Sequence, residues 1–197
     1  GALEETAALL EPVLQRQPNL PQALALLGAL RGRQGRAAEA RTVLQRALHL
    51  APGNPLATRE LGKLALAGGD KSASQALLKA AVTAAPEDLD AHCARLLAGP
   101  VAAGDASIAV VRAALAASTT ATDLLPRLHA ALARVAEEEG DFATALAHLE
   151  QANAAIGALP GTLPPEVLRR LLALDADRLA KLRRAGDSSS APVLILG

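Results

Sequence analysis

Aromatic residues are almost absent from this sequence of 197 residues, in which Phe142 stands without any Trp or Tyr. Large flat side chains therefore cannot fill a core, and the β-branched residues that favour strands are also sparse. Ala and Leu supply much of the 51% hydrophobic content, and both are strong helix formers. The composition predicts an all-α protein in which small side chains let the helices approach closely.

Cysteine and net charge are scarce as well. Cys93 is the single cysteine, which excludes an intramolecular disulfide and fits a reducing compartment, so we expect a cytoplasmic location. Lys and Arg together number 20, as do Asp and Glu, so no overall charge attracts nucleic acid or an anionic membrane. No run of 18 apolar residues is free of charge and proline, and "GALEETAALL" carries acids where a signal peptide carries bases. We expect neither nucleic acid nor a membrane as partner.

Residue types that perform catalysis or bind metals are present without the necessary spacing. Cys93 follows His92, but adjacent residues of a helix point about 100° apart, so we expect a structural thiol rather than a nucleophile. None of the four histidines belongs to an HxxxH or HxxE pattern. A run of three acids, Glu137 to Glu139, precedes a turn and predicts a solvated helix end. Contact of these acids with a partner is the alternative, because acids near a helix C-terminus oppose the helix dipole. We expect no catalytic, cofactor or metal site in this chain.

What the sequence does contain is a repeat. Prolines recur 34 residues apart at Pro18, Pro52 and Pro86, and the glycine pairs Gly28/Gly62 and Gly35/Gly69 have the same spacing. Gly104 and Gly140 continue the second series at intervals of 35 and 36. This period is typical of a helix–turn–helix unit stacked on copies of itself. The spacing predicts turns near Gly35, Gly69, Gly104 and Gly140.

The unit from Pro21 to Asn54 shows how each repeat is expected to fold. Gly28 lacks a side chain, which lets the second helix of the unit pack close to the first, and Gly35 permits the left-handed backbone of a helix stop. The second helix carries a buried stripe at spacings of four and three, formed by Ala40, Leu44 and Ala47.

These residues resemble the repeat of the tetratricopeptide repeat family. In each repeat of that family, fixed positions hold Leu-Gly, then Ala, a bulky residue, a second Ala and Pro, and this sequence fills them in the same order. The unit over 21–54 places there Leu27, Gly28, Ala40, Leu44, Ala47 and Pro52, and the unit over 55–88 places Leu61, Gly62, Ser74, Leu78, Ala81 and Pro86. The unit over 126–159 has Leu132, Ala133, Ala145, Leu149 and Ala152, whereas the unit over 89–122 is degenerate and lacks Leu-Gly. The resemblance implies a right-handed α-solenoid over 1–159, with about four and a half repeats and a clipped first unit that leaves an apolar face uncovered.

The period stops after the fourth unit. Residues 160–186 predict a linking helix, and 187–197 contain a short linker and the strand-like run "APVLILG". Together with "EEGDFATALAHLEQANA", this text is similar to bacterial fusions of tetratricopeptide repeats with a sulfotransferase domain. The resemblance implies that "PVLILG" is the first strand of an absent α/β domain. It implies phosphoadenosine phosphosulfate (PAPS) as cofactor of the parent protein and none in this chain.

The concave groove of such a solenoid is the remaining candidate for a binding site. Its expected positions include four cations, at Arg59, Lys63, Arg127 and Arg134, against the single acid Glu137, which favours an acidic protein or peptide as partner. The first unit contributes Ala25 and Ala29 at equivalent positions. An ordinary solvated surface is the alternative.

Two functions are compatible with these patterns. In the first, the chain is the non-catalytic scaffold of a PAPS-dependent sulfotransferase and presents an acceptor or partner to the parent's own catalytic domain. In the second, it is a free-standing adaptor that binds a peptide or protein in its groove.

Overall fold

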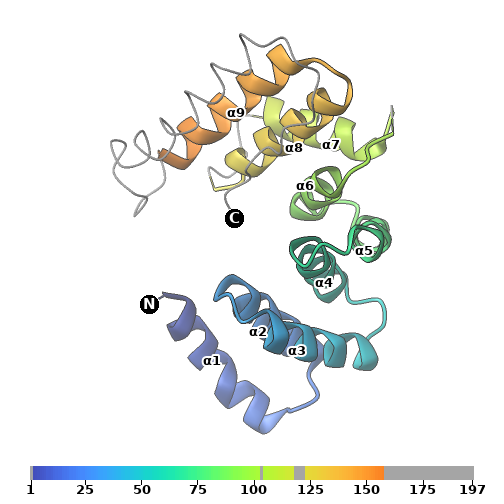
Figure 1. Ribbon diagram of the computed structural model, residues 1–197. Coiled ribbons are helices and arrows are strands. Elements are labelled where there is room, and N and C mark those ends of the chain that lie inside the picture. The colour runs from blue at the N-terminus through green and yellow to red at the C-terminus, as the bar shows by residue number, and fades with distance from the viewer. Residues whose placement is uncertain (1, 103, 118–122, 158–197) are drawn as a thin grey trace. The chain divides into compact units, whose positions relative to one another are not determined.

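The computed structural model describes residues 2–102, 104–117 and 123–157, which form helices and contain no strand (Figure 1). The helices are α1 (Ala2–Arg16), α2 (Pro21–Arg33), α3 (Ala37–Leu50), α4 (Pro55–Ala67), α5 (Lys71–Ala84), α6 (Leu89–Ala98), α7 (Ala106–Ala116), α8 (Leu125–Glu138) and α9 (Phe142–Gly157). The all-α prediction is therefore confirmed for these residues. The chain divides into two compact units, Gly1–Ala155 and Ile156–Gly197. The helix expected over 160–186 and the strand expected over 192–197 lie outside the described residues.

Asp and Asn side chains begin several of the helices. Asn54, Asp70, Asp88, Asp105 and Asp141 each accept a hydrogen bond from a backbone N–H two or three residues further on, at 2.9–3.2 Å. Such caps satisfy backbone donors that the first turn of a helix leaves free. The short polar stretches between the apolar stripes therefore fix where each helix starts.

The predicted turns are found where the glycine series placed them. Gly35, Gly69, Gly104 and Gly140 have φ values of 75°, 82°, 84° and 77°. A side chain would strain this left-handed backbone, although open space surrounds the position that a Cβ would occupy at each of the four. The glycines are therefore required by the backbone conformation rather than by packing.

Two further glycines are required by packing. A Cβ at Gly28 would lie 2.5 Å from Leu44 Cγ, and a Cβ at Gly62 would lie 2.7 Å from Leu78 Cγ. Both leucines are fully buried. The close approach of α2 to α3 and of α4 to α5 therefore depends on a glycine facing a leucine.

Successive first helices of the units lie against one another. Helix α2 packs on α4, α4 on α6, and α6 on α8. Helices α2, α4 and α6 also pack on the helices that precede and follow them, and α8 packs on α7. Among the described residues, the second helices α3, α5 and α7 make no comparable contacts with each other. The first helices therefore form one continuous face of the 1–155 unit.

The unit formed by α6 and α7 is the irregular one. Helix α6 has 10 residues, whereas α4 has 13. Residues 99–105 connect α6 to α7, whereas residues 68–70 suffice between α4 and α5. The early end of α6 follows from the Gly99–Pro100 pair, because Pro cannot continue a helical hydrogen-bond ladder.

Helix α1 carries an exposed apolar face, as the sequence predicted. Leu9 is 74% exposed and Val13 is 40% exposed.

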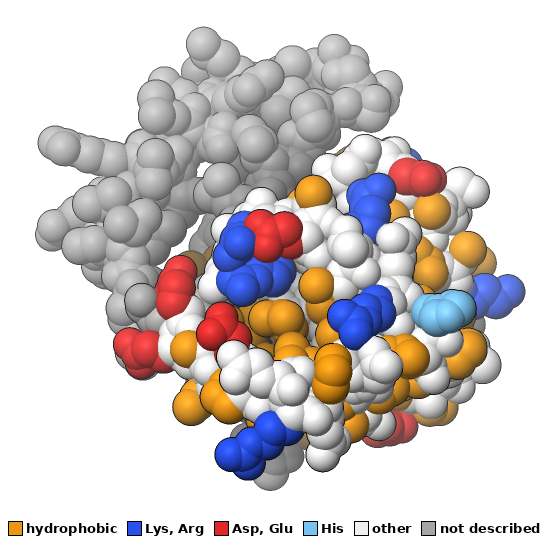
Figure 2. All heavy atoms as spheres, turned by 90° about the horizontal axis from the view of Figure 1, so that it is seen from below, with side chains coloured by type: hydrophobic (Ala, Val, Ile, Leu, Met, Phe, Trp, Pro, Cys, Tyr) orange, Lys and Arg blue, Asp and Glu red, His pale blue; other side chains and the backbone are white. Residues whose placement is uncertain are grey.

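Seen from below in Figure 2, the surface shows apolar side chains interspersed with charges of both signs, several of them adjacent. Opposite charges on this surface therefore lie close enough to compensate one another.

Candidate functional site

The candidate site is built around the N-terminus of α6. Asp88 is the N-cap of this helix and accepts a hydrogen bond from Ala91 N–H at 3.2 Å, and Asp90 lies in the first turn. Carboxylates are favoured there because the backbone N–H groups give the N-terminus a partial positive charge. The start of α6 therefore presents two carboxylates to the neighbouring first helices.

Asp90 joins cations from two other first helices. Its Oδ2 lies 3.4 Å from Arg59 Nε and 3.3 Å from Lys63 Nζ, both on α4, and its Oδ1 lies 2.9 Å from Arg127 Nη1 on α8. We call this cluster the Asp90 network; its members are Arg59, Lys63, Arg127, Glu60, Asp88 and Asp90. The network connects α4, α6 and α8 along the face that these helices share.

Arg59 is the most enclosed cation of the network. It pairs with Asp88 and lies 3.0 Å from Glu60 Oε1, and its side chain is 13% exposed. Burial opposes its charge, but the carboxylates of Asp90, Asp88 and Glu60 outweigh that effect and raise the pKa of Arg59. Arg59 is therefore held in place by the protein.

The acid at the centre of the network is stabilised in its charged form. Burial favours the neutral carboxyl, but Lys63, Arg127 and Arg59 lower the pKa of Asp90 below its ordinary value. Three cations and three carboxylates make up the network, so its net charge is zero. Lys63 and Arg127 are its accessible cations, with 31% and 45% of their side chains exposed.

Arg134, the fourth predicted cation, belongs to a separate cluster. Its guanidinium lies 2.7 Å from Glu137 Oε2 and 2.6 Å from Glu138 Oε1, both on α8. The structure therefore brings together Arg59, Lys63 and Arg127, and leaves Arg134 with carboxylates of its own helix.

The acids Asp88 and Asp90 were not among the site residues predicted from the sequence. Asp90 stands 34 residues after Leu56, at an equivalent groove position, but its unit over 89–122 lacks the Leu-Gly pair that marks the repeat register. Asp88 could have been recognised as an N-cap residue directly before a helical pattern. In the first unit, Ala25 and Ala29 are buried, with 0% and 8% exposure, so the expectation that they line the groove was wrong.

Cys93 and His92 have structural roles. Burial raises the pKa of the Cys93 thiol to about 12, so the reactive thiolate is scarce at neutral pH. His92 Nδ1 hydrogen-bonds Ser107 Oγ at 3.0 Å, and its Nε2 hydrogen-bonds the Pro86 carbonyl at 2.9 Å. Both ring nitrogens are therefore occupied within the protein, and the expectation of a structural thiol agrees with this geometry.

A contact between two histidines was not anticipated. His129 on α8 and His148 on α9 place their Nδ1 atoms 3.0 Å apart, and their ring centroids lie 5.3 Å apart. Burial lowers the pKa of both imidazoles. The charge of His148 lowers the pKa of His129 further, and the charge of Arg112 lowers the pKa of His148 further.

Within the described part of the chain, no three His, Cys, Asp or Glu residues are grouped so that they could hold a metal ion.

None of the described helices is long and apolar enough to cross a membrane. No curated protein matches the chain.

The comparisons with known proteins agree on the repeat architecture. Residues 33–98 match the model of the tetratricopeptide repeat family. The MamA fragment "41-end from Desulfovibrio magneticus RS-1" is 23% identical, with a TM-score of 0.53, and the match covers 82% of this chain and 89% of that one. A second MamA structure is 18% identical, with a TM-score of 0.51 and coverages of 78% and 88%.

A third solved structure comes from a protein described as "YrrB: a TPR protein with an unusual peptide-binding site". It is 16% identical, with a TM-score of 0.51, and the match covers 90% of this chain and 84% of that chain. At these identities the likeness shows the fold alone. The family match over 33–98 and the shared solenoid fold support the tetratricopeptide repeat family for this chain.

Proposed function

We propose that this chain is a protein-interaction scaffold that binds a peptide or protein segment along the face formed by α4, α6 and α8. The observation that supports this proposal is the Asp90 network, which gathers cations from α4 and α8 at one place on that face. The fold likeness to a protein with a peptide-binding site is consistent with such a use.

The partner segment that fits this surface is acidic. A guanidinium has five N–H donors and an ammonium has three, so pairing with Asp90 leaves donors of Arg127 and Lys63 for a second carboxylate. Both side chains are partly exposed, whereas Arg59 stays with Asp88. A carboxylate of the partner would therefore bind at the edge of a preformed network without breaking it.

Fluorescence anisotropy with a labelled Glu-rich decapeptide tests the proposal, and a Lys-rich decapeptide serves as the opposite probe. We expect the Glu-rich peptide to bind more tightly and the Arg127→Glu variant to weaken it by about tenfold, which corresponds to ~1.4 kcal/mol. Arg36→Glu is the matched control, because Arg36 is an exposed cation paired with Glu39 at the start of α3. Equal binding of both peptides, or equal losses in the two variants, would contradict the proposal.

A second proposal concerns the parent protein. We propose that the scaffold belongs to a PAPS-dependent sulfotransferase, because "EEGDFATALAHLEQANA" and "APVLILG" resemble the repeat–sulfotransferase junction. A free-standing cytoplasmic adaptor is the alternative.

The sequence of the parent reading frame and an assay of sulfuryl transfer distinguish the sulfotransferase from the free-standing adaptor. We expect a phosphate-binding loop to be encoded directly after Gly197, and we expect the parent protein to transfer a sulfuryl group from PAPS. The 197-residue chain is expected to be inactive, because its sequence contains neither a phosphate cradle nor a paired general base. Sulfuryl transfer by this purified chain would contradict the assignment.

A further inference from the structure

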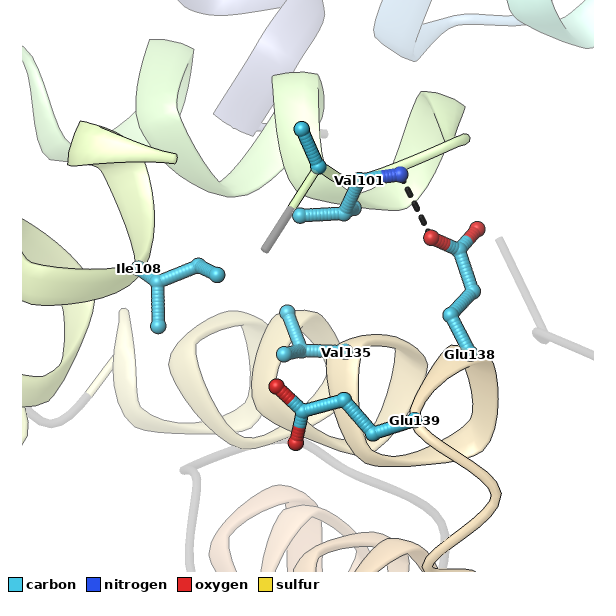
Figure 3. Close-up of a pocket in the computed structure, with 6 residues that line it drawn as sticks. Val101, Ile108, Val135, Glu138 and Glu139 are labelled. Atoms are coloured by element: carbon cyan, nitrogen blue, oxygen red, sulfur yellow. Dashed lines mark hydrogen bonds between the residues drawn. The ribbon is translucent and has the colours of Figure 1, made fainter. Parts of the chain in front are cut away.

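The irregular unit leaves a pocket at the C-terminal end of α8. Helix α4 reaches Ala67, and the residue 34 positions later is Val101, but α6 already ends at Ala98. The missing turn leaves a pocket of about 250 Å³ lined by Val101, Ala102, Ile108, Val135, Glu138 and Glu139 (Figure 3). This volume is below the roughly 300–1,000 Å³ of sites for drug-sized ligands and suits one long side chain.

The two glutamates of the pocket have different roles. Glu138 accepts a hydrogen bond from Val101 N–H and pairs with Arg134, so it fixes the connection after α6 against α8. The carboxylate of Glu139 has no hydrogen-bond or ion-pair partner among the described residues. Figure 3 shows its side chain running beneath Val135, with the carboxylate directed toward the Ile108 side.

The pocket mouth is electrostatically negative. Glu138 and Glu139 provide two carboxylates in the pocket lining, and the guanidinium of Arg134 compensates Glu138. The C-terminus of α8 adds the partial negative charge of the helix dipole. An apolar floor, with a carboxylate at its edge that has no ion-pair partner among the described residues, therefore favours a ligand that is aliphatic along its length and cationic at its tip.

We propose that this pocket binds a lysine side chain of a partner protein. The aliphatic stem would pack on Val101, Ile108 and Val135, and the ammonium would pair with Glu139, as lysines do when they bury their stems and keep the charged end at the surface. The proposal is independent of the acidic-peptide site on the Asp90 network, because the two surfaces share no residue and attract opposite charges. It gives the glutamate run of α8 a function in recognition.

Capped amino acids test this inference by methyl NMR, with the resonances of Val101, Ile108 and Val135 as reporters. The probes are N-acetyl-lysine amide and its uncharged counterpart N-acetyl-norleucine amide, which retains the aliphatic stem. We expect saturable shifts for the lysine probe and about fivefold weaker binding of the norleucine probe. Glu139→Gln should reduce lysine binding to the norleucine level.

Glu137→Gln is the matched control. It removes the same charge from the same helix end, but Glu137 pairs with Arg134 and does not line the pocket. We expect this variant to bind the lysine probe within about twofold of the unchanged protein. Equal binding of lysine and norleucine, absence of shifts at the three reporters, or equal losses in the two Glu→Gln variants would each overturn the proposal. Glu139 is exposed, so its replacement should not prevent folding.

Discussion

The helix pairs α4–α5 and α6–α7 bury the same repeat position in opposite ways. In α4 the position is Gly62, and its missing side chain makes room for Leu78 of α5. In α6 the residue 34 positions later is Leu96, which is itself fully buried. Leu96 packs in a cluster with Ile108, Val111 and Val135, so larger side chains replace the close backbone approach. A repeat can therefore keep its period while the side chains at its helix contact change.

The largest expected loss of stability comes from the irregular pair. Leu96→Ala should lower the free energy of unfolding by ~3 kcal/mol, because it removes buried apolar surface and leaves a cavity in a cluster of branched side chains. Urea denaturation followed by circular dichroism measures the change. Leu26→Ala, at a position that is 47% exposed on α2, is the control and should cost less than ~1 kcal/mol. Similar losses in both variants would mean that Leu96 does not organise the α6–α7 pair.

The contact between the two pairs should depend on Asp90. Asp90→Asn removes one carboxylate from three cations, and we expect a loss of ~2 kcal/mol, below the 3–5 kcal/mol of a fully buried pair because the network is partly exposed. Glu39→Gln disrupts the exposed Arg36–Glu39 pair and should change stability by less than ~0.5 kcal/mol. The same denaturation experiment measures both. An equal and small effect of the two substitutions would show that the network does not stabilise the stack.

The glycine contact of the regular pair is tested by Gly62→Ala. The added Cβ would lie 2.7 Å from Leu78 Cγ, so we expect a loss of ~1–2 kcal/mol despite the better helix propensity of Ala. Gly53→Ala is the control, because nothing lies within 4 Å of its Cβ position. Thermal unfolding should show a lower midpoint for the first variant and little change for the second. A stabilising Gly62→Ala substitution would indicate that α4 and α5 can separate without cost.

The two helix pairs also differ in how they treat a buried serine hydroxyl, which belongs to Ser74 in the α4–α5 pair and to Ser107 in the α6–α7 pair. Ser74 Oγ on α5 is buried without a hydrogen-bond partner among the described residues, whereas Ser107 Oγ on α7 bonds His92 at 3.0 Å. We expect Ser74→Ala to stabilise by ~1 kcal/mol and Ser107→Ala to destabilise by a similar amount. Opposite shifts of the urea midpoint are the expected result. Destabilisation by Ser74→Ala would show that its hydroxyl has a partner in solution.

The smallest effect is expected from pH, through the histidines that connect α8 and α9. Their pKa values are lowered in the folded protein, so the unfolded chain binds more protons as pH falls below about 6.5. Stability should therefore decrease from pH 7.5 to pH 5.5, and His148→Gln should flatten this dependence. Thermal midpoints across this range provide the measurement. A midpoint that rises on acidification would contradict the assigned direction.

The sequence predicted features that depend on single residues at a fixed period. The left-handed turns at Gly35 and Gly69 and the Gly28–Leu44 contact follow from the lack of a glycine side chain, which acts in the same way in every repeat. These features could be read from the spacing because each depends on a few neighbouring residues.

Features that join different units were harder to predict. The Asp90 network collects residues from three helices, and its centre lies in the unit that had lost the Leu-Gly signal. His129 and His148 are 19 residues apart on two helices, so no short metal-binding or catalytic spacing revealed their contact. The pocket near Glu139 depends on where α6 stops, and helix ends are the least predictable part of a helix.

The Asp90 network also has a consequence for how the solenoid comes apart. Solenoid stability is usually a sum of terms within repeats and between nearest neighbours, which allows terminal repeats to open one at a time. Asp90 is shared by Arg59 and Arg127, which belong to units separated by a whole repeat. Opening either flanking unit removes a countercharge from the same carboxylate, so each opening event makes the next one easier. The helices from α4 to α8 should consequently exchange their amide hydrogens as one cooperative block, with fraying confined to the ends of the array.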